Sequence, residues 1–317
     1  MRVPKYEKIE LLETIAEMYY IKNLSQEEIS KLLSMSRSNI SKLLKSCKDE
    51  NVVEFKINYS SKSKTALEME LTRKFKLEVA AIAPSGSYSE LSKVNVGKSA
   101  AAFLKKIIKP HSLIGISWGT TLFHVINNLE ANPSAYADSI QMVGGFETKN
   151  IDTNGQEIAK KLARAFNGHC YMLQTPMIVQ TKVLKDLLLE EPQISEHFRM
   201  FKDIDIALIG LGSNQPYLNS VFKSGYITEK EVREIINMGA VADICGRHLD
   251  ISGNICKTEI SDRVIGISLE QLKKIPTVIG VASGTDKKDA VLSALRGSFV
   301  NMIIVDEDLA YALLNDD

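Results

Sequence analysis

The stretch QEEISKLLSMSRSNISKLLK, residues 26–45, has the spacing of two short helices joined by a tight turn. On both sides of the turn, apolar side chains recur three and four residues apart, as in helices that bury one face. They are Ile29, Leu32 and Leu33 in the first helix, residues 26–33, and Ile40, Leu43 and Leu44 in the second, residues 37–47. Ser25 and Ser36 precede the two helices, and a serine hydroxyl can cap free backbone amides.

This spacing matches the helix-turn-helix pattern of bacterial regulators, with two departures. Ser30 stands where a small alanine is usual, and Ser34 stands in the turn where glycine is usual. Serine is small enough for the first position, while the second requires a left-handed backbone that costs about 1 kcal/mol. Neither departure breaks the motif, so we predict a helix-turn-helix.

The exposed side of the second helix favours double-stranded operator DNA as its partner. Residues 31–48 contain five Lys or Arg side chains and no Asp or Glu. The short polar side chains between them can reach base edges, and the basic ones can hold phosphates. The alternative is a solvated basic helix in an ordinary helical hairpin. We predict DNA contacts from Gln26, Ser36, Arg37, Ser38, Asn39, Ser41, Lys42 and Lys45.

The charge of the chain is unevenly distributed. The 317 residues are enough for two or three domains, and their formal net charge is zero. Residues 1–64 hold 12 basic and 9 acidic side chains, whereas residues 65–317 hold 27 and 30. A slightly basic segment on a slightly acidic remainder fits a DNA-binding module joined to a domain with another task.

Cysteine spacing and hydropathy exclude several classes of protein. The four cysteines have no zinc or redox spacing, and no H-E-x-x-H motif occurs, so we expect no metal and no other cofactor. The N-terminus is too charged for a signal peptide, and no apolar run approaches the roughly 20 residues of a membrane span. We therefore expect a cytoplasmic protein with free thiols and no membrane partner.

The segments around the motif suggest domain boundaries. Residues 6–21 have the pattern of an amphipathic helix that would brace the two motif helices, and residues 52–58 alternate like a half-buried strand. Such a strand would form a wing beside the reading helix. The following residues are polar and rich in serine. We expect a winged helix-turn-helix domain at 1–58, a linker at 59–64 and a second domain at 65–317.

Beyond a helix expected at 65–75, strand patterns alternate with helix patterns. Several strands are continuous apolar runs, which is typical of strands buried on both faces. We therefore predict an α/β fold with an open, mostly parallel sheet. The expected strands are 79–83, 113–117, 140–143, 170–174, 205–210, 277–282 and 301–305, and the expected helices are 94–108, 122–129, 156–166, 182–189, 229–238, 287–295 and 309–314.

Four of the expected strands end in loops that suit a ligand. In open α/β sheets, ligands bind beyond the carboxyl ends of the strands, and glycine there lets them approach the backbone. The alternative is that glycine only makes the turn, since neither a dinucleotide nor a P-loop signature occurs. The candidate residues in these loops are Gly119, Thr120, Thr121, Gly144, Gly145, Gly212, Ser213, Ser283, Gly284 and Lys287.

The chain resembles the SorC family of bacterial sugar-responsive transcriptional regulators over nearly its whole length. The resemblance rests on YYIKNLSQEEISKLLSMSRSNISKLLK, VGKSAA, IGISWGTTL, ALIGLGS, GAVADICGRHLD, DRVIGISLEQL and VIGVASG. It implies a C-terminal effector domain that looks like sugar-phosphate isomerases of the glucosamine-6-phosphate deaminase and ribose-5-phosphate isomerase type. It also implies a phosphorylated sugar effector, a dimer or tetramer, and most often repression of a carbohydrate-utilisation operon.

The same resemblance implies roles for individual residues. The effector's phosphate would lie on Gly119, Thr120, Thr121, Gly284 and Lys287, and its hydroxyls would meet Asn154, Gln156, Ser213 and Asp243. Two positions depart from the family pattern, because Ser283 replaces a glycine and His248 replaces an aromatic residue. No other lysine lies in the four loops, which argues against a covalent imine with an aldehyde sugar.

The alternative function is a sugar-phosphate isomerase fused to a DNA-binding module. Isomerisation needs a base beside the sugar, and Asp243 is a candidate. The five histidines form no motif with a nearby nucleophile. Because the DNA-binding module makes ligand binding the controlling event, we expect a regulator and not an enzyme.

Overall fold

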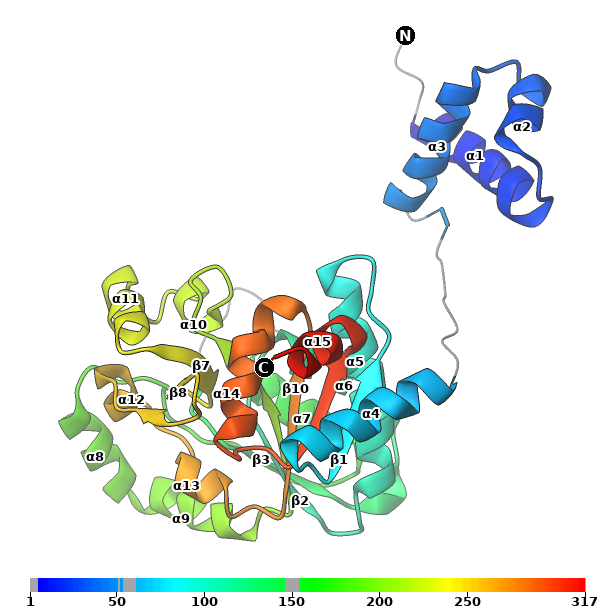
Figure 1. Cartoon of the computed structure of the whole chain (residues 1–317). Helices are drawn as coiled ribbons and strands as arrows, with labels where there is room; N and C mark the ends of the chain where they lie inside the picture. Colours follow the sequence, from blue (N-terminus) through cyan, green and yellow to red (C-terminus); the bar gives the residue numbers. More distant parts are fainter. Residues whose placement is uncertain (1–4, 51, 54–60, 146–153, 317) are drawn as a thin grey trace. The chain divides into compact units, whose positions relative to one another are not determined.

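The computed structural model describes residues 5–50, 52–53, 61–145 and 154–316. The chain divides into two compact units, Met1–Ser60 and Ser61–Asp317, and each is considered by itself. The first unit is all-helical where it is described, and the second combines sheets and helices (Figure 1).

The N-terminal unit contains the predicted helix-turn-helix. Helix α1 (Lys5–Ala16) continues into the π-helix η1 (Glu17–Ile21), and helices α2 (Gln26–Leu32) and α3 (Arg37–Asp49) follow. The hydroxyl of Ser25 accepts from the Glu28 N–H and closes a capping box, while the hydroxyl of Ser36 accepts from the Asn39 N–H at 3.2 Å. Ser34 has a φ of 53°, the left-handed backbone that the turn requires. Both helices and both caps are therefore confirmed.

A small core holds these three helices together. Ile15 of α1, Ile29 of α2 and Ile40 of α3 are fully buried against one another. Helix α1 thus braces the motif, as expected. Val52 and Val53 pack beside α1 and α3, but the rest of the expected strand lies outside the described residues, so the wing stays a prediction.

The C-terminal unit is organised by a parallel sheet of seven strands in its described part. The strand order is β1-β11-β10-β5-β2-β3-β4. All seven expected strands belong to it, which confirms the α/β fold class. Their bounds are β1 (Val79–Ala83), β2 (Leu113–Ile116), β3 (Asp138–Gln141), β4 (Cys170–Tyr171), β5 (Ile206–Gly210), β10 (Thr277–Ala282) and β11 (Met302–Asp306).

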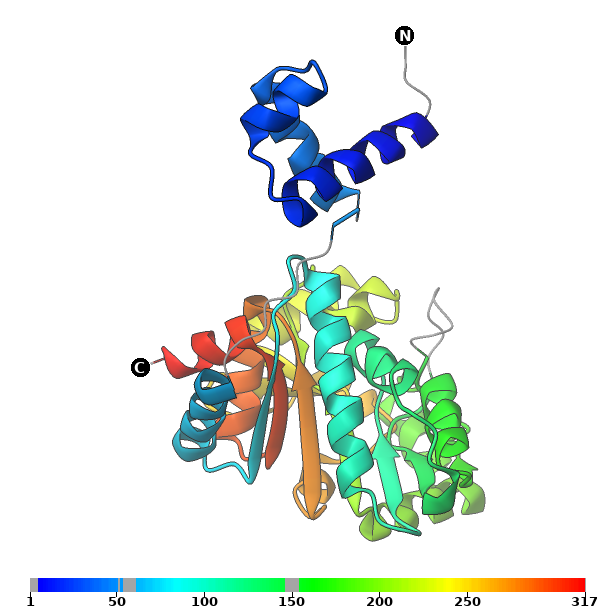
Figure 2. The same ribbon diagram turned by 90° about the vertical axis from the view of Figure 1, so that its right-hand side faces the viewer.

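Helices cover both faces of this sheet, so its strands are buried on both sides. Helices α5 (Ser89–Ile107), α6 (Thr120–Asn127) and α7 (Gly155–Ala165) pack on one face, and Figure 2 shows α5 in cyan across it. Helices α4 (Ser61–Phe75), α14 (Lys288–Arg296) and α15 (Glu307–Leu314) pack on the other. Neighbouring residues of β5 point to opposite faces: Leu208 packs in the core under α5, α6 and α7, and Ile209 packs in the core under α4, α14 and α15.

A second, antiparallel sheet was not predicted. Its order is β6-β7-β8-β9, formed by β6 (Gly212–Ser213), β7 (Ala240–Ile244), β8 (Arg247–Asp250) and β9 (Ile255–Cys256). Two of these strands have only two residues, too few for a recognisable alternation. The β7–β8 turn places Cys245 at φ 54° and Gly246 at φ 75°, a left-handed pair in which cysteine is an unusual first residue.

The remaining elements are short. They are the helices α8 (Lys182–Glu190), α9 (Pro192–Met200), α10 (Ser220–Lys223), α11 (Glu229–Asn237), α12 (Glu259–Arg263) and α13 (Leu269–Leu272), and the 3₁₀ turns η2 (Pro133–Ala135), η4 (Phe201–Asp203) and η5 (Thr285–Lys287). The predicted linker at 59–64 extends too far, because α4 begins at Ser61. The polar composition of residues 61–64 suggested a loop, but polar residues are also compatible with the first turn of a helix.

Replacing Gly97 by alanine is expected to destabilise the C-terminal unit. Gly97 of α5 lies against α6, and a Cβ there would sit 2.6 Å from the Cβ of His124 and 2.7 Å from its carbonyl carbon. Because the backbone of a helix cannot shift locally, we expect the free energy of unfolding to fall by about 1–3 kcal/mol, as measured by urea-induced unfolding of the full chain. Lys98→Ala, an exposed change in the same turn, should stay within about 0.5 kcal/mol of the unmodified chain. Equal stability of both variants would contradict the close packing of α5 on α6.

Candidate functional site

One face of α3 gathers the predicted DNA contacts. Ile40, Leu44 and Cys47 point into the core, and Ser38, Ser41, Lys42 and Lys45 lie on the opposite side of the helix. Ser36, Arg37 and Asn39 are exposed at the N-terminal end of α3, while Gln26 at the start of α2 is half-buried. The N-terminal turn of such a helix is the part that enters the major groove. The arrangement therefore suits a reading helix.

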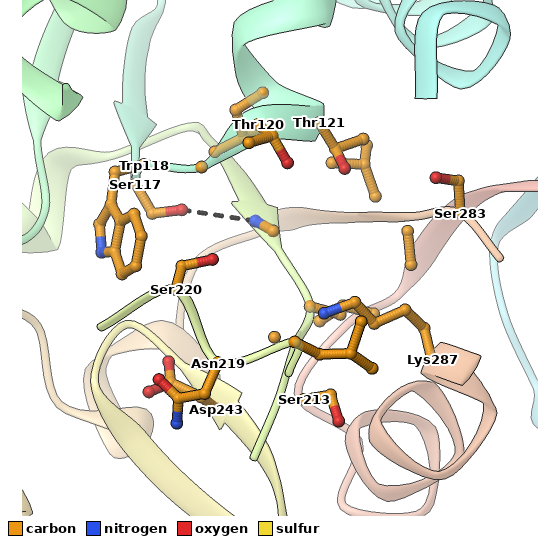
Figure 3. A pocket seen from close by; sticks show the side chains of 18 of the residues that line it. Ser117, Trp118, Thr120, Thr121, Ser213, Asn219, Ser220, Asp243, Ser283 and Lys287 are labelled. Carbon is orange, nitrogen blue, oxygen red and sulfur yellow. Dashed lines mark hydrogen bonds between the residues drawn. The ribbon is translucent and has the colours of Figure 1, made fainter. Parts of the chain in front are cut away.

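A pocket lies at the carboxyl ends of three neighbouring strands, β2, β5 and β10 (Figure 3). Three of the four predicted loops meet there, because parallel strands bring their carboxyl ends to one edge of the sheet. The antiparallel sheet contributes a wall through β7. The polar and glycine residues in its lining are Lys93, Ser117, Gly119, Thr120, Thr121, Gly210, Gly212, Ser213, Asn219, Ser220, Asp243, Ser283 and Lys287.

The N-terminus of α6 forms a part of the pocket that can take an anion. Gly119 is its N-cap, and its φ of 133° is one that only glycine adopts readily. Within the described chain, no side chain caps this helix. Its first amides, together with the hydroxyls of Thr120 and Thr121, can therefore donate to a negatively charged group.

Lys287 supplies a positive charge to the same pocket. Its side chain extends into the pocket from the end of η5 (Figure 3). Burial lowers the pKa of Lys287 to about 8; the carboxylates of Asp286 and Asp243 oppose this shift, and the ammonium groups of Lys93 and Lys223 add to it. A bound anion would replace the solvation that this ammonium group has lost.

Asp243 of β7 is the acidic member of the pocket. Burial raises the pKa of its carboxyl to about 6, although the Gly246 N–H donates to its Oδ1 at 3.1 Å. His248 Nε2 lies 3.7 Å from Asp243 Oδ2, but burial lowers the pKa of His248 to about 4, so the ring is neutral at physiological pH. The other ring nitrogen of His248 lies 2.8 Å from the hydroxyl of Thr258. Among the described residues, Asp243 forms no ion pair with a lysine or arginine, although the charges of Lys287 and Arg247 act on it, so its Oδ2 can accept a hydrogen bond from a ligand.

Gly284 has a structural role in the β10 loop. Its N–H donates to Asp306 Oδ2 at 2.6 Å, and Oδ1 of the same carboxylate accepts from Leu309 N–H and caps α15. Because that amide is already paired and Gly284 is not part of the pocket lining, the expected phosphate contact of Gly284 stays a prediction. The φ of 91° at Gly284 explains the glycine, and the neighbouring Ser283 lines the pocket.

Besides Gly284, four predicted residues do not line the pocket: Gly144, Gly145, Asn154 and Gln156. Gly144 packs so tightly that a Cβ would sit 2.5 Å from the Pro176 carbonyl oxygen, and Gly145 donates to Thr175 O at 2.8 Å. Asn154 Oδ1 accepts from the Gln156 N–H at 2.9 Å and caps α7. Because residues 146–153 between them lie outside the described chain, effector contacts by these four residues stay a prediction.

The pocket also includes residues that sequence patterns did not single out. Lys93 comes from α5, Ser117 from the end of the β2 segment, Asn219 and Ser220 from the start of α10, and Cys245 from the β7–β8 turn. Ser117 could have been recognised as the residue that follows β2. The others lie in segments without a strand-to-helix glycine signal, and only the tertiary fold brings them to this edge.

Two further properties bear on the class of protein. Among the described residues, no cluster of three or more His, Cys, Asp or Glu side chains is placed to hold a metal ion. None of the helices in the same ranges combines the length and the apolar character needed to cross a bilayer.

Comparison with known proteins gives the family. The family model described as "Putative sugar-binding domain" matches residues 60–315. The "Sorbitol operon regulator" of Klebsiella pneumoniae is 27% identical over 318 residues, covering 96% of this chain and 98% of that protein. The crystal structure of full-length SorC from the same organism has 25% identity and a TM-score of 0.74, covering 98% of this chain and 100% of that one. This chain belongs to the SorC family.

Two other relatives align with most of this chain. The "Deoxyribonucleoside regulator" of Bacillus subtilis (strain 168) is 29% identical over 312 residues, covering 98% of this chain and 99% of that protein. A "DeoR family transcriptional regulator" from Listeria monocytogenes is 32% identical with a TM-score of 0.73, covering 79% of this chain and 99% of that one. The SorC-family chain is accordingly a DNA-binding transcriptional regulator with a sugar-binding domain.

Proposed function

We propose that this SorC-family regulator represses a carbohydrate-utilisation operon and that a phosphorylated sugar controls its affinity for the operator. The observation that carries the proposal is the division of the pocket. The N-terminus of α6 and Lys287 provide an anion-binding part, and Asp243 with the neighbouring polar side chains provides a part for hydroxyl groups. A phosphorylated sugar has both groups on one molecule.

In this proposal, the two units divide the work. Residues 1–58 bind DNA through α3, a short linker follows, and the second unit binds the effector and forms a dimer or tetramer. A symmetric oligomer would present two reading helices to two half-sites, as helix-turn-helix regulators do. The effector shifts the balance between DNA-competent and incompetent arrangements only if it binds the two with different affinities.

The test is a screen of the full chain against pentose and hexose phosphates and their dephosphorylated forms. Thermal shift reports binding, and release of a labelled operator fragment reports control of DNA affinity. We expect one phosphorylated sugar to stabilise the protein and change operator affinity, with its dephosphorylated form much weaker. Binding that is insensitive to the phosphate would overturn the choice of effector class.

One observation favours a second candidate, an isomerase activity. Asp243 lies in the pocket, and its pKa of about 6 suits a general base near neutral pH. The relatives named above are described as regulators and not as enzymes. Incubating the full chain with the bound sugar phosphate and following the aldose-to-ketose ratio separates the two, and we expect no conversion above the background rate.

The affinity for the effector is expected to pass through a maximum between pH 6 and pH 8. A ligand hydroxyl that donates to Asp243 favours the carboxylate, so affinity rises as the pH increases through its pKa of about 6. A phosphate favours the protonated Lys287, so affinity falls as the pH increases through its pKa of about 8. Isothermal titration across this range measures both the rise in affinity near pH 6 and the fall near pH 8.

Two variants separate the contributions to this profile. A phosphate monoester itself ionises near pH 6. In Asp243→Asn, the affinity should therefore still rise around pH 6, but only by the amount that the ionisation of the ligand causes. Lys287→Arg keeps its positive charge far above pH 8, so the fall in effector affinity around pH 8 should disappear. If the effector affinity of Lys287→Arg still falls around pH 8, a group other than Lys287 causes that fall.

A further inference from the structure

Asn219 is a buried side chain with a free hydrogen-bond donor. It is 3% exposed and stands at the N-cap of α10, where its Oδ1 accepts from the Phe222 N–H at 3.0 Å. Its Nδ2 has no partner among the described residues. Asn219 also lines the pocket, so this unpaired donor is located where a ligand would bind.

The orientation of this amide is fixed by the cap. If the amide were flipped, Nδ2 would face the Phe222 N–H, and two donors would meet. Nδ2 must therefore point away from the helix. Aspartate would cap α10 about as well as asparagine and would leave no unpaired donor. Capping alone does not explain why an asparagine with a costly buried N–H occupies this position.

Asp243 provides the complementary acceptor in the same pocket. Its Oδ1 accepts from Gly246, while within the described ranges its Oδ2 has only the long 3.7 Å approach to the His248 ring. In the view of Figure 3, Asn219 and Asp243 lie on the side of the pocket opposite Thr120 and Thr121. Donor and acceptor thus occur away from the proposed phosphate end, where the carbon chain of a sugar phosphate would extend.

We propose that Asn219 is a specificity-determining residue, whose Nδ2 donates to a hydroxyl oxygen of the effector while Asp243 accepts from the sugar's hydroxyl protons. This inference rests on the proposed function, since it assigns the hydroxyl-recognition part of the same pocket. A hydroxyl group is both an acceptor and a donor, so a polyhydroxylated chain satisfies Nδ2 and Oδ2 together. A ligand without the matching hydroxyl leaves the buried N–H unpaired and binds more weakly.

The test compares Asn219→Ser with the unmodified full chain. Serine retains a capping oxygen and removes the Nδ2 donor. Thr228→Ser is the matched control, because it is an equally conservative change at the N-cap of the next helix, α11, outside the pocket lining. The probes are inorganic phosphate, ribose 5-phosphate, fructose 6-phosphate and glucose 6-phosphate, together with singly deoxygenated forms of each sugar phosphate. Isothermal titration gives the affinities.

We expect Asn219→Ser to bind the best sugar phosphate roughly tenfold more weakly, with inorganic phosphate affinity and melting temperature unchanged. One deoxy sugar phosphate should bind the variant and the unmodified chain equally, since the interaction is already absent. If Asn219→Ser keeps full affinity for a sugar phosphate that the unmodified chain binds, the inference is wrong while the proposed function stands. An equal loss for inorganic phosphate, or a lowered melting temperature, would assign Asn219 a structural role instead. If no sugar phosphate binds the unmodified chain, the proposed function itself fails.

Discussion

Replacing Arg37 and Asn39 together by alanine is expected to weaken specific operator binding roughly 100-fold or more, because each good contact to a base edge contributes about 1–3 kcal/mol. Both side chains are exposed at the N-terminal end of α3. The Ser36 cap uses the Asn39 backbone N–H, so the substitution leaves the helix start intact. Fluorescence anisotropy with a labelled operator fragment measures the loss, and the thermal shift caused by the sugar phosphate should be unchanged.

The salt dependence distinguishes the roles of the two side chains. If Arg37 also holds a phosphate, Arg37→Ala alone should lower the slope of log affinity against log salt by roughly one. Lys22→Ala is the control. Lys22 is an exposed basic residue of the same unit, its Nζ pairs with Glu17 at 3.1 Å, and it lies outside α3. A comparable loss of specific binding in Lys22→Ala would show that net charge, and not the reading helix, determines affinity.

Lys287→Ala is expected to weaken binding of the phosphorylated sugar roughly 10- to 100-fold, the usual range for a lost charged hydrogen bond. DNA binding without effector should not change. The melting temperature of the free protein should stay equal or increase, because the pocket no longer has to bury an ammonium group. More sugar phosphate should then be needed to change operator affinity.

The neighbouring lysine provides a matched control for this prediction. Lys288 is adjacent in the sequence, but its Nζ pairs with Asp316 at 2.7 Å, and it does not belong to the pocket lining. Lys288→Ala should therefore keep the full effector response. If Lys287→Ala also weakened binding of the dephosphorylated sugar to the same extent, Lys287 would contact the sugar and not the phosphate.

The main sheet could be predicted because its strands carry their own signal. The runs 206–210 and 278–282 are apolar throughout, since helices cover both faces, and the loops after them contain the glycines of the turn. The antiparallel sheet has no such signal. The pairing of β6 with β7 joins Gly212 to Asp243, thirty-one residues apart, and depends on the fold of the whole unit.

The residues of the candidate site could be predicted from the sequence only where they directly follow strands of the main sheet. Thr120, Thr121 and Lys287 follow strands of the main sheet and could be identified, because parallel strands end together. Asn219 could not be identified, because its importance lies in an unpaired atom that only the packed structure reveals. Gly284 was assigned to the ligand from its position in a glycine loop, whereas the neighbouring strand β11 provides Asp306, which occupies its amide.

The pairing of Gly284 with Asp306 connects the pocket to the segment that carries the DNA-binding unit. Asp306 begins α15, α15 packs on α4, and Lys74 of α4 donates to the Leu314 carbonyl at 2.8 Å. Helix α4 starts at Ser61, the first residue of the second unit. The β10 loop is therefore linked, through the Asp306 carboxylate and the packed helices α15 and α4, to the residue at which the second unit begins.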